Sequence, residues 1–144
     1  MPKIIVVYAT KGGETLKLAE LIAEELRSLN MDVKLVDASD IKTTRDLFGY
    51  DAYVFGSPTY FGEMTESMKD VLLMAEKSEL TGKAGATFGA YGWSGEAPKR
   101  IHDTITYVFR MNTIREPLMV SSGASKIASK SIPIFCKELA AKIK

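Results

Sequence analysis

The sequence predicts an α/β domain with a parallel β-sheet and helices on both of its faces. Short apolar runs rich in β-branched residues alternate along the chain with longer segments whose apolar residues recur at helical spacing. Strict alternation of strand and helix requires right-handed crossovers between parallel strands. The length of 144 residues suits one domain, and the chain contains no linker or internal repeat. We therefore expect a single domain over residues 1–144.

Five strands are expected. The runs at residues 3–8 and 52–56 are continuously apolar, which is typical of strands buried on both faces. Residues 32–37 alternate between apolar and polar, which indicates a strand nearer the edge of the sheet. A glycine-rich segment, 84–91, forms the fourth strand, and residues 115–120 form the fifth.

Helical spacing of apolar residues predicts the connecting helices at residues 14–29, 64–78 and 95–112, and over the last apolar stretch, 132–143. Residues 38–50 are mixed in character and predict one or two helical turns near 45–48. Ser131 is the expected N-cap of the last helix, and Pro133 is tolerated there in the first turn.

Composition excludes several function classes. Nineteen Lys and Arg against eighteen Asp and Glu give a net charge of +1, which argues against a protein that coats nucleic acid. The charge is uneven, at −5 over residues 1–96 and +6 over residues 97–144. A single cysteine, Cys136, and a single histidine, His102, exclude an internal disulfide, a cysteine-based metal cluster and a multi-histidine site.

The apolar run at residues 4–8 is too short for a signal-peptide core or a membrane span. We therefore expect a soluble cytoplasmic protein with neither membrane nor nucleic acid as its partner.

In parallel α/β sheets, ligands bind beyond the carboxyl ends of the strands, where the strand order reverses. The first such loop, residues 9–15, joins a buried strand to a helix N-terminus. Its small residues and the hydroxyl groups of Thr10 and Thr15 are suited to an anion cradle. The alternative is a solvated turn with Gly12 and Gly13 at positive φ. Neither G-x-x-x-x-G-K-[ST] in a strand-to-helix loop nor G-x-G-x-x-G occurs.

The loops after the third and fourth strands carry exposed aromatic residues. Tyr60 and Phe61 are adjacent in the first of them, and Tyr91 and Trp93 lie among glycines in the second. These rings either cap the edge of the sheet or cover a flat ligand. Beside an anion cradle, they favour a planar aromatic ligand that carries a phosphate.

Residues 8–15, 56–63 and 89–97 together resemble the three FMN-binding loops of the flavodoxin family. The segments GSPTY and YGWSGEA are similar in particular to the flavodoxin-like module of flavodiiron proteins. The resemblance covers nearly the whole chain, and the last strand lacks a long insertion, as in short-chain flavodoxins. It implies a flavodoxin-like three-layer sandwich with a five-stranded parallel sheet in the order 2-1-3-4-5.

The resemblance also implies where FMN binds. The phosphate would be held by Thr10, Lys11, Gly12, Gly13, Glu14 and Thr15. One side of the isoalloxazine would face Pro58, Thr59, Tyr60, Phe61 and Gly62, with Tyr60 or Phe61 covering the ring. The other side would face Ala90, Tyr91, Gly92, Trp93, Ser94 and Gly95, with Tyr91 or Trp93 stacked on it.

Glu14 departs from the family pattern, which commonly has Asn, Ser or Thr at this position. A carboxylate cannot donate to a phosphate, and its charge disfavours the neighbouring anion by ~1 kcal/mol when solvated. Lys11 offsets that charge, and the backbone N–H of Glu14 can still donate. We expect FMN affinity to change by about an order of magnitude or less.

The function implied is that of a flavodoxin, a low-potential electron carrier between redox proteins with no substrate of its own. A reductase or ferredoxin-type protein would be the donor. The alternatives are an NAD(P)H-dependent FMN or quinone reductase of the same superfamily and a separate flavin subunit of a flavodiiron-like system. A phospho-acceptor receiver domain is excluded, because the required Asp residues are missing. We expect a monomer, with a dimer as the alternative.

Several residues carry narrower expectations. Gly62 would let the peptide near flavin N5 change orientation, because it has no Cβ. The excess of acidic residues in segment 58–96, which includes Glu63, would steer the flavin end toward a basic partner surface. His102 is expected on the solvated surface and Cys136 as a buried, inert thiol. Three methionines are expected to fill the core, Met64, Met68 and Met74.

Overall fold

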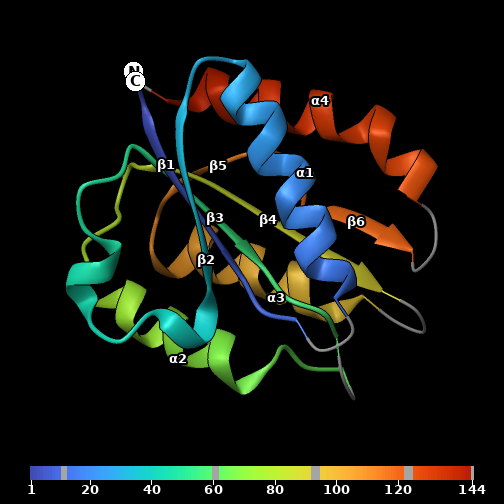
Figure 1. Cartoon of the computed structure of the whole chain (residues 1–144). Coiled ribbons are helices and arrows are strands. Elements are labelled where there is room, and N and C mark those ends of the chain that lie inside the picture. Colours follow the sequence, from blue (N-terminus) through green and yellow to red (C-terminus); the bar gives the residue numbers. More distant parts are fainter. Residues whose placement is uncertain (11–12, 60–61, 92–94, 122–124, 144) are drawn as a thin grey trace.

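The computed structural model describes residues 1–10, 13–59, 62–91, 95–121 and 125–143, and only the secondary structure of residues 91, 121 and 125–129. Its centre is a parallel sheet (Figure 1). The strands are β1 (Lys3–Tyr8), β2 (Asp32–Asp37), β3 (Ala52–Gly56), β4 (Ala84–Tyr91), β5 (Asn112–Thr113) and β6 (Leu118–Ser121). The order β2-β1-β3-β4-β5, with β6 also paired to β4, confirms the expected topology.

Helices cover both faces of the sheet, and the three-layer sandwich is therefore confirmed. In Figure 1, α1 (Glu14–Ser28) and α4 (Ser125–Lys142) lie on one face, and α2 (Glu66–Glu76) and α3 (Glu96–Asp103) lie on the other. Two short helical turns, η1 (Ala38–Asp40) and η2 (Thr44–Leu47), follow β2. Among the described helices, none is both long enough and apolar enough to cross a lipid bilayer.

The burial of the strands follows their sequence patterns. Residues 4–7 of β1 are fully buried, and every residue of β3 is buried, as expected for central strands with helices on both faces. In β2, the alternation exposes Asp32 and Lys34 while Val33 is buried, which matches its place at the edge.

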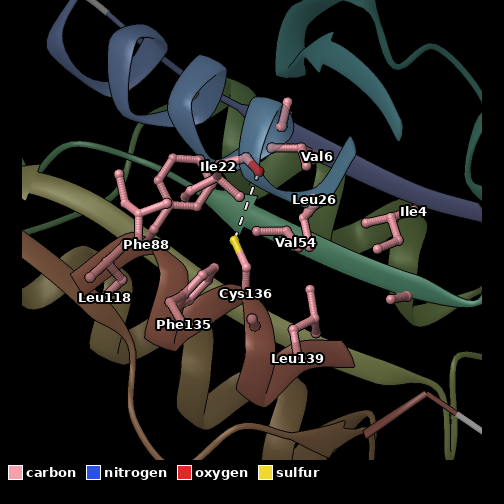
Figure 2. Close-up of a cluster of buried hydrophobic side chains, with 14 of the residues drawn as sticks. Ile4, Val6, Ile22, Leu26, Val54, Phe88, Leu118, Phe135, Cys136 and Leu139 are labelled. Atoms are coloured by element: carbon pink, nitrogen blue, oxygen red, sulfur yellow. Dashed lines mark hydrogen bonds between the residues drawn. The ribbon is translucent and has the colours of Figure 1, made fainter. Parts of the chain in front are cut away.

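Two apolar cores hold the layers together. The core under α1 and α4 contains the fully buried Phe88, Leu139 and Cys136 (Figure 2). The thiol of Cys136 donates to the carbonyl oxygen of Ile22 on α1, at an S–O distance of 3.8 Å. The predicted burial of Cys136 is thus confirmed, and burial raises the pKa of its thiol to about 12, which favours the protonated, unreactive form.

The core under α2 and α3 contains Phe55 from the sheet and the fully buried Met68 from α2. Met64 and Met74 are partly buried and pack against it, so the prediction of a core position is confirmed for Met68 and met in part by the other two methionines. His102 differs from its prediction. It borders the apolar face of α3 and is half-buried, and its Nδ1 is buried without a hydrogen-bond partner among the described residues.

The predicted fifth strand, 115–120, is wrong at its start. The fifth position of the sheet is divided between β5 and β6, because residues 114–117 lie opposite only residues 86–87 of β4. The two extra residues break the ladder as a β-bulge does. Pro117 lies in the break and has no N–H to donate to a ladder.

The predicted helix 95–112 ends early. The α-helical part stops at Asp103, and a π-helical turn, η3 (Thr104–Val108), continues it. Arg110 then takes a left-handed conformation, with φ of 56°, and turns the chain into β5. Asn112 therefore begins a strand rather than ending a helix.

The last helix begins earlier than predicted. It starts at Ser125, so Ser131 is an interior residue and not the N-cap. Pro133 also lies inside the helix, where it removes one hydrogen bond of the helical ladder. The apolar residues Ile132, Phe135 and Leu139 still pack into the core, and this packing sustains the helix across the proline.

Candidate functional site

The loops after β1, β3 and β4 begin side by side at the carboxyl edge of the sheet. The N–H of Ala9 donates to the carbonyl of Gly56 at 2.9 Å, and the N–H of Ser57 donates to the carbonyl of Phe88 at 3.2 Å. The first bond lies just past the ends of β1 and β3, and the second joins the residue after β3 to β4, which continues to Tyr91. Because these three strands are adjacent and parallel, the three predicted loops leave the sheet at the same edge. The expectation that they form one site is thus supported by the geometry of their described ends.

The first loop ends at the N-terminus of α1. Gly13 precedes this helix with φ of 85°, a conformation that favours glycine, and its N–H donates to Oγ1 of Thr10 at 2.9 Å. The first helical bond runs from the N–H of Lys17 to the carbonyl of Gly13, at 3.1 Å. The N–H groups of residues 14–16 precede it and point out of the helix end, where they can bind an anion.

The side chains around this helix end differ in exposure. Thr15 is only 2% exposed, and Glu14 is exposed at the start of the helix. The hydroxyl of Thr10 accepts from Gly13 and keeps its own hydrogen to donate. Lys11 and Gly12 lie outside the described residues. The described part of this loop thus has the donors expected of an anion cradle.

The second loop is held by hydrogen bonds of the buried Ser57. The buried Ser57 donates its hydroxyl hydrogen to the carbonyl of Pro58 at 2.9 Å and accepts from the N–H of Thr65 at 3.2 Å. Thr65 is the N-cap of α2 and accepts from the N–H of Met68. Gly62 has φ of 75°. The predicted aromatic residues Tyr60 and Phe61 lie outside the described residues.

The third loop joins β4 to α3. Ala90 is half-buried, and Tyr91 ends β4 in register with Ser121 of β6. Gly95 directly precedes α3. The remaining predicted residues, Gly92, Trp93 and Ser94, lie outside the described part of the chain.

Three contacts at the site were not predicted, although Thr59 itself was among the predicted FMN-binding residues. Oγ1 of Thr59 accepts from the N–H of Ala97 in α3, and the Glu63 carboxylate pairs with Arg100 of the same helix. Gly89 of β4 lies beneath both loops, since a Cβ there would come within 2.5 Å of the carbonyl oxygen of Ser57. Gly95 has no side chain that could accept from the N–H groups of the helix that follows it. This was the sequence signal that another segment supplies the capping side chain.

The charge of the second loop is more balanced than the residue count of segment 58–96 suggested. Glu63 contacts Arg100 Nη1 at 3.0 Å and Lys69 Nζ at 3.3 Å, and Lys69 also contacts Glu66 at 3.4 Å. The hydrogen bond with Glu63 raises the pKa of Lys69. Arg100 lies beyond the counted segment, so the expected acidic rim is partly neutralised. No group of metal-ligating side chains gathers anywhere in the described ranges.

Comparison with known proteins agrees with this geometry. The family model for flavodoxin matches residues 6–113. A flavodoxin of Aquifex aeolicus (strain VF5) is 36% identical over 99 residues, which are 66% of this chain and 54% of that protein. The match thus spans about half the length of this relative.

Solved structures match over nearly the whole chain. A flavodoxin from the domain Archaea superposes with a TM-score of 0.83 at 29% identity, over 96% of this chain and 99% of that one. The flavodiiron protein from Giardia intestinalis gives a TM-score of 0.85 at 20% identity, over 97% of this chain and 36% of that one, which is a likeness of fold.

Proposed function

The chain belongs to the flavodoxin family, whose members bind FMN, and on this basis we propose that it is an FMN-binding electron carrier between redox proteins. The observation that supports the proposal is that a helix N-terminus suited to an anion lies beside two further loops at adjacent strand ends. We propose residues 1–144 as one FMN-binding domain. The partners would be a reductase or ferredoxin-type donor and a separate acceptor protein.

The described residues fit the phosphate end of FMN. A Cβ on Gly13 or Gly62 would meet no atom of the described residues within 4 Å, so neither glycine is closely packed against the described part of the chain. The N–H groups of residues 14–16 and the Thr10 hydroxyl would bind the phosphate. Residues 58–62 and 90–95 would enclose the ring. FMN, when bound, supplies the redox chemistry, and the protein orients it and limits its contact with water.

The proposal predicts that the purified protein binds FMN in a one-to-one complex. Quenching of flavin fluorescence during titration, together with the visible absorption spectrum of the complex, measures this directly. Reduction should then proceed in two separate one-electron steps. A protein that takes up no FMN contradicts the proposal. Turnover of NADPH and quinone without an added partner would favour the reductase instead.

Gly62→Ala tests the second loop. At φ of 75°, alanine is strained, so we expect a loss of about 1 kcal/mol in the free energy of unfolding. If the neighbouring peptide must reorient toward flavin N5, the gap between the two one-electron potentials should also narrow. Potentiometric titration of both variants measures that gap. An unchanged gap would show that Gly62 has no part in tuning the potentials.

A further inference from the structure

The start of α3 is capped by a residue from a different loop. Gly95 precedes the helix and has no side chain with which to accept from its free N–H groups. Thr59, which follows β3, supplies that acceptor, with its Oγ1 at 2.9 Å from the N–H of Ala97. The second loop is thereby bonded to the first turn of the helix that follows the third loop.

A second contact joins the same two segments at the surface. Glu63 ends the second loop, and its carboxylate oxygens contact Arg100 of α3 at 3.0 Å and Lys69 of α2 at 3.3 Å. The side chains of Arg100 and Glu63 are 56% and 42% exposed, so this ion pair is solvated and weakened by salt. The second loop is therefore connected to α3 at both ends of the loop, through Thr59 at its start and through the ion pair of Glu63 with Arg100 at its end.

Beneath these contacts the backbone is closely packed. Gly89 of β4 leaves no room for a Cβ, because the carbonyl oxygen of Ser57 and Cγ of Pro98 both lie 2.5 Å from that position. The hydroxyl of Thr87 in β4 donates to the carbonyl of Pro98 at 3.1 Å. The first turn of α3 is thus fixed to the sheet, and the second loop is fixed to that turn.

We propose that Thr59 and Arg100 are positioning residues that hold the two ring-flanking segments, 58–62 and 90–95, at a fixed separation before the flavin binds. They do so by joining the described ends of the second loop to the start of α3, which directly follows the third loop. This inference rests on the proposed function. Every contact that carries it joins two protein atoms, so none of these contacts needs a ligand atom. A binding site that is assembled in advance does not lose affinity to the population of unassembled states.

The proposal makes a specific prediction about two flavins. Riboflavin has the isoalloxazine ring but no phosphate, whereas FMN has both. Loss of a contact that positions the ring-flanking segments should weaken both flavins by the same factor. A residue that acted by attracting the phosphate would weaken FMN alone.

The test compares Thr59→Val and Arg100→Met with two matched controls. Lys99→Met removes a neighbouring positive charge of α3 that makes no ion pair among the described residues, and Thr81→Val removes a threonine hydrogen bond far from the site, to the carbonyl of Phe109. We expect Thr59→Val to weaken both flavins about two- to fivefold and Arg100→Met about twofold, with both controls unchanged. Dissociation constants come from flavin fluorescence titration.

The ligand-free protein supplies a second measurement, the hydrogen exchange of the Ala97 amide. We expect this exchange to be faster in Thr59→Val than in the wild type, because the amide loses its acceptor. Equal affinities of wild type and both variants, or weakening of FMN alone by Arg100→Met, would overturn the proposal. If the wild type binds neither flavin, the proposed function fails. The hydrogen exchange of the Ala97 amide still tests the hydrogen bond between Ala97 and Thr59. An exchange rate in Thr59→Val equal to that of the wild type would refute this hydrogen bond.

Discussion

Gly89→Ala is expected to lower the free energy of unfolding by about 2–3 kcal/mol and to weaken FMN binding by at least about tenfold. The new Cβ would lie 2.5 Å from the carbonyl oxygen of Ser57 and 2.5 Å from Cγ of Pro98. A backbone oxygen and a proline ring within a helix cannot move aside as a flexible side chain can. The second loop must therefore shift away from α3, and the ring-flanking segments would separate.

Gly85→Ala is the matched control, because it makes the same change on the same strand and the same face. Its Cβ would meet Met111 Cε at 3.0 Å and Ile105 Cδ1 at 3.3 Å, which are the ends of flexible side chains. We expect a smaller loss of stability and unchanged FMN affinity. Urea unfolding and fluorescence titration of both variants measure the two quantities. Equal effects of the two substitutions on binding would show that Gly89 has no special place under the site.

The free energy of unfolding should fall as pH rises above 9, and Cys136 should account for a measurable part of the fall. Its pKa is about 12 in the folded protein, against an ordinary value of 9.0, chiefly because burial disfavours the thiolate. Between these two pKa values the unfolded chain loses the thiol proton while the folded chain keeps it. The unfolded state is therefore stabilised, and the free energy of unfolding falls. The slope is about 1.4 kcal/mol per pH unit, or roughly 2–3 kcal/mol between pH 9 and 11.

Cys136→Ala isolates this contribution. The variant is less stable at pH 7, because it loses the packing of a fully buried sulfur, but its stability should fall less steeply above pH 9. Tyr8 and Tyr53, whose pKa values are also raised, titrate in both proteins and cancel in the difference. Urea unfolding at a series of pH values gives both slopes. Parallel curves for the two proteins would contradict the pKa of Cys136.

The strands were predicted well because their burial leaves a direct trace in the sequence. The first four have the predicted boundaries. For β1 and β3 the reason is that a strand buried on both faces needs an uninterrupted apolar run such as residues 4–7. The strand order came from the resemblance of the loops, and not from periodicity. The predicted loops do lie at the carboxyl edge of the sheet, where ligands of such folds bind.

The errors lie where tertiary packing overrides local preference. A proline inside a helix removes a hydrogen bond of its ladder, but the burial of Ile132 before Pro133 and of Phe135 after it holds α4 together. The apolar residues of the π-helical turn after Asp103 recur at nearly α-helical spacing, and the predicted helix was therefore extended too far, into β5. Thr59 contacts α3, and Arg100 contacts the second loop. Both contacts join residues far apart in the sequence, so no local sequence pattern predicts them.

The divided edge of the sheet has a consequence for association between molecules. An uninterrupted edge strand offers a row of free N–H and C=O groups on which another chain can add a strand. Here β5 has two residues and β6 has four, and the four residues between them are out of register with β4. An incoming strand could therefore form only a short ladder before it met the break. The break between β5 and β6, which made the predicted fifth strand wrong at its start, thus limits strand addition and aggregation at this edge.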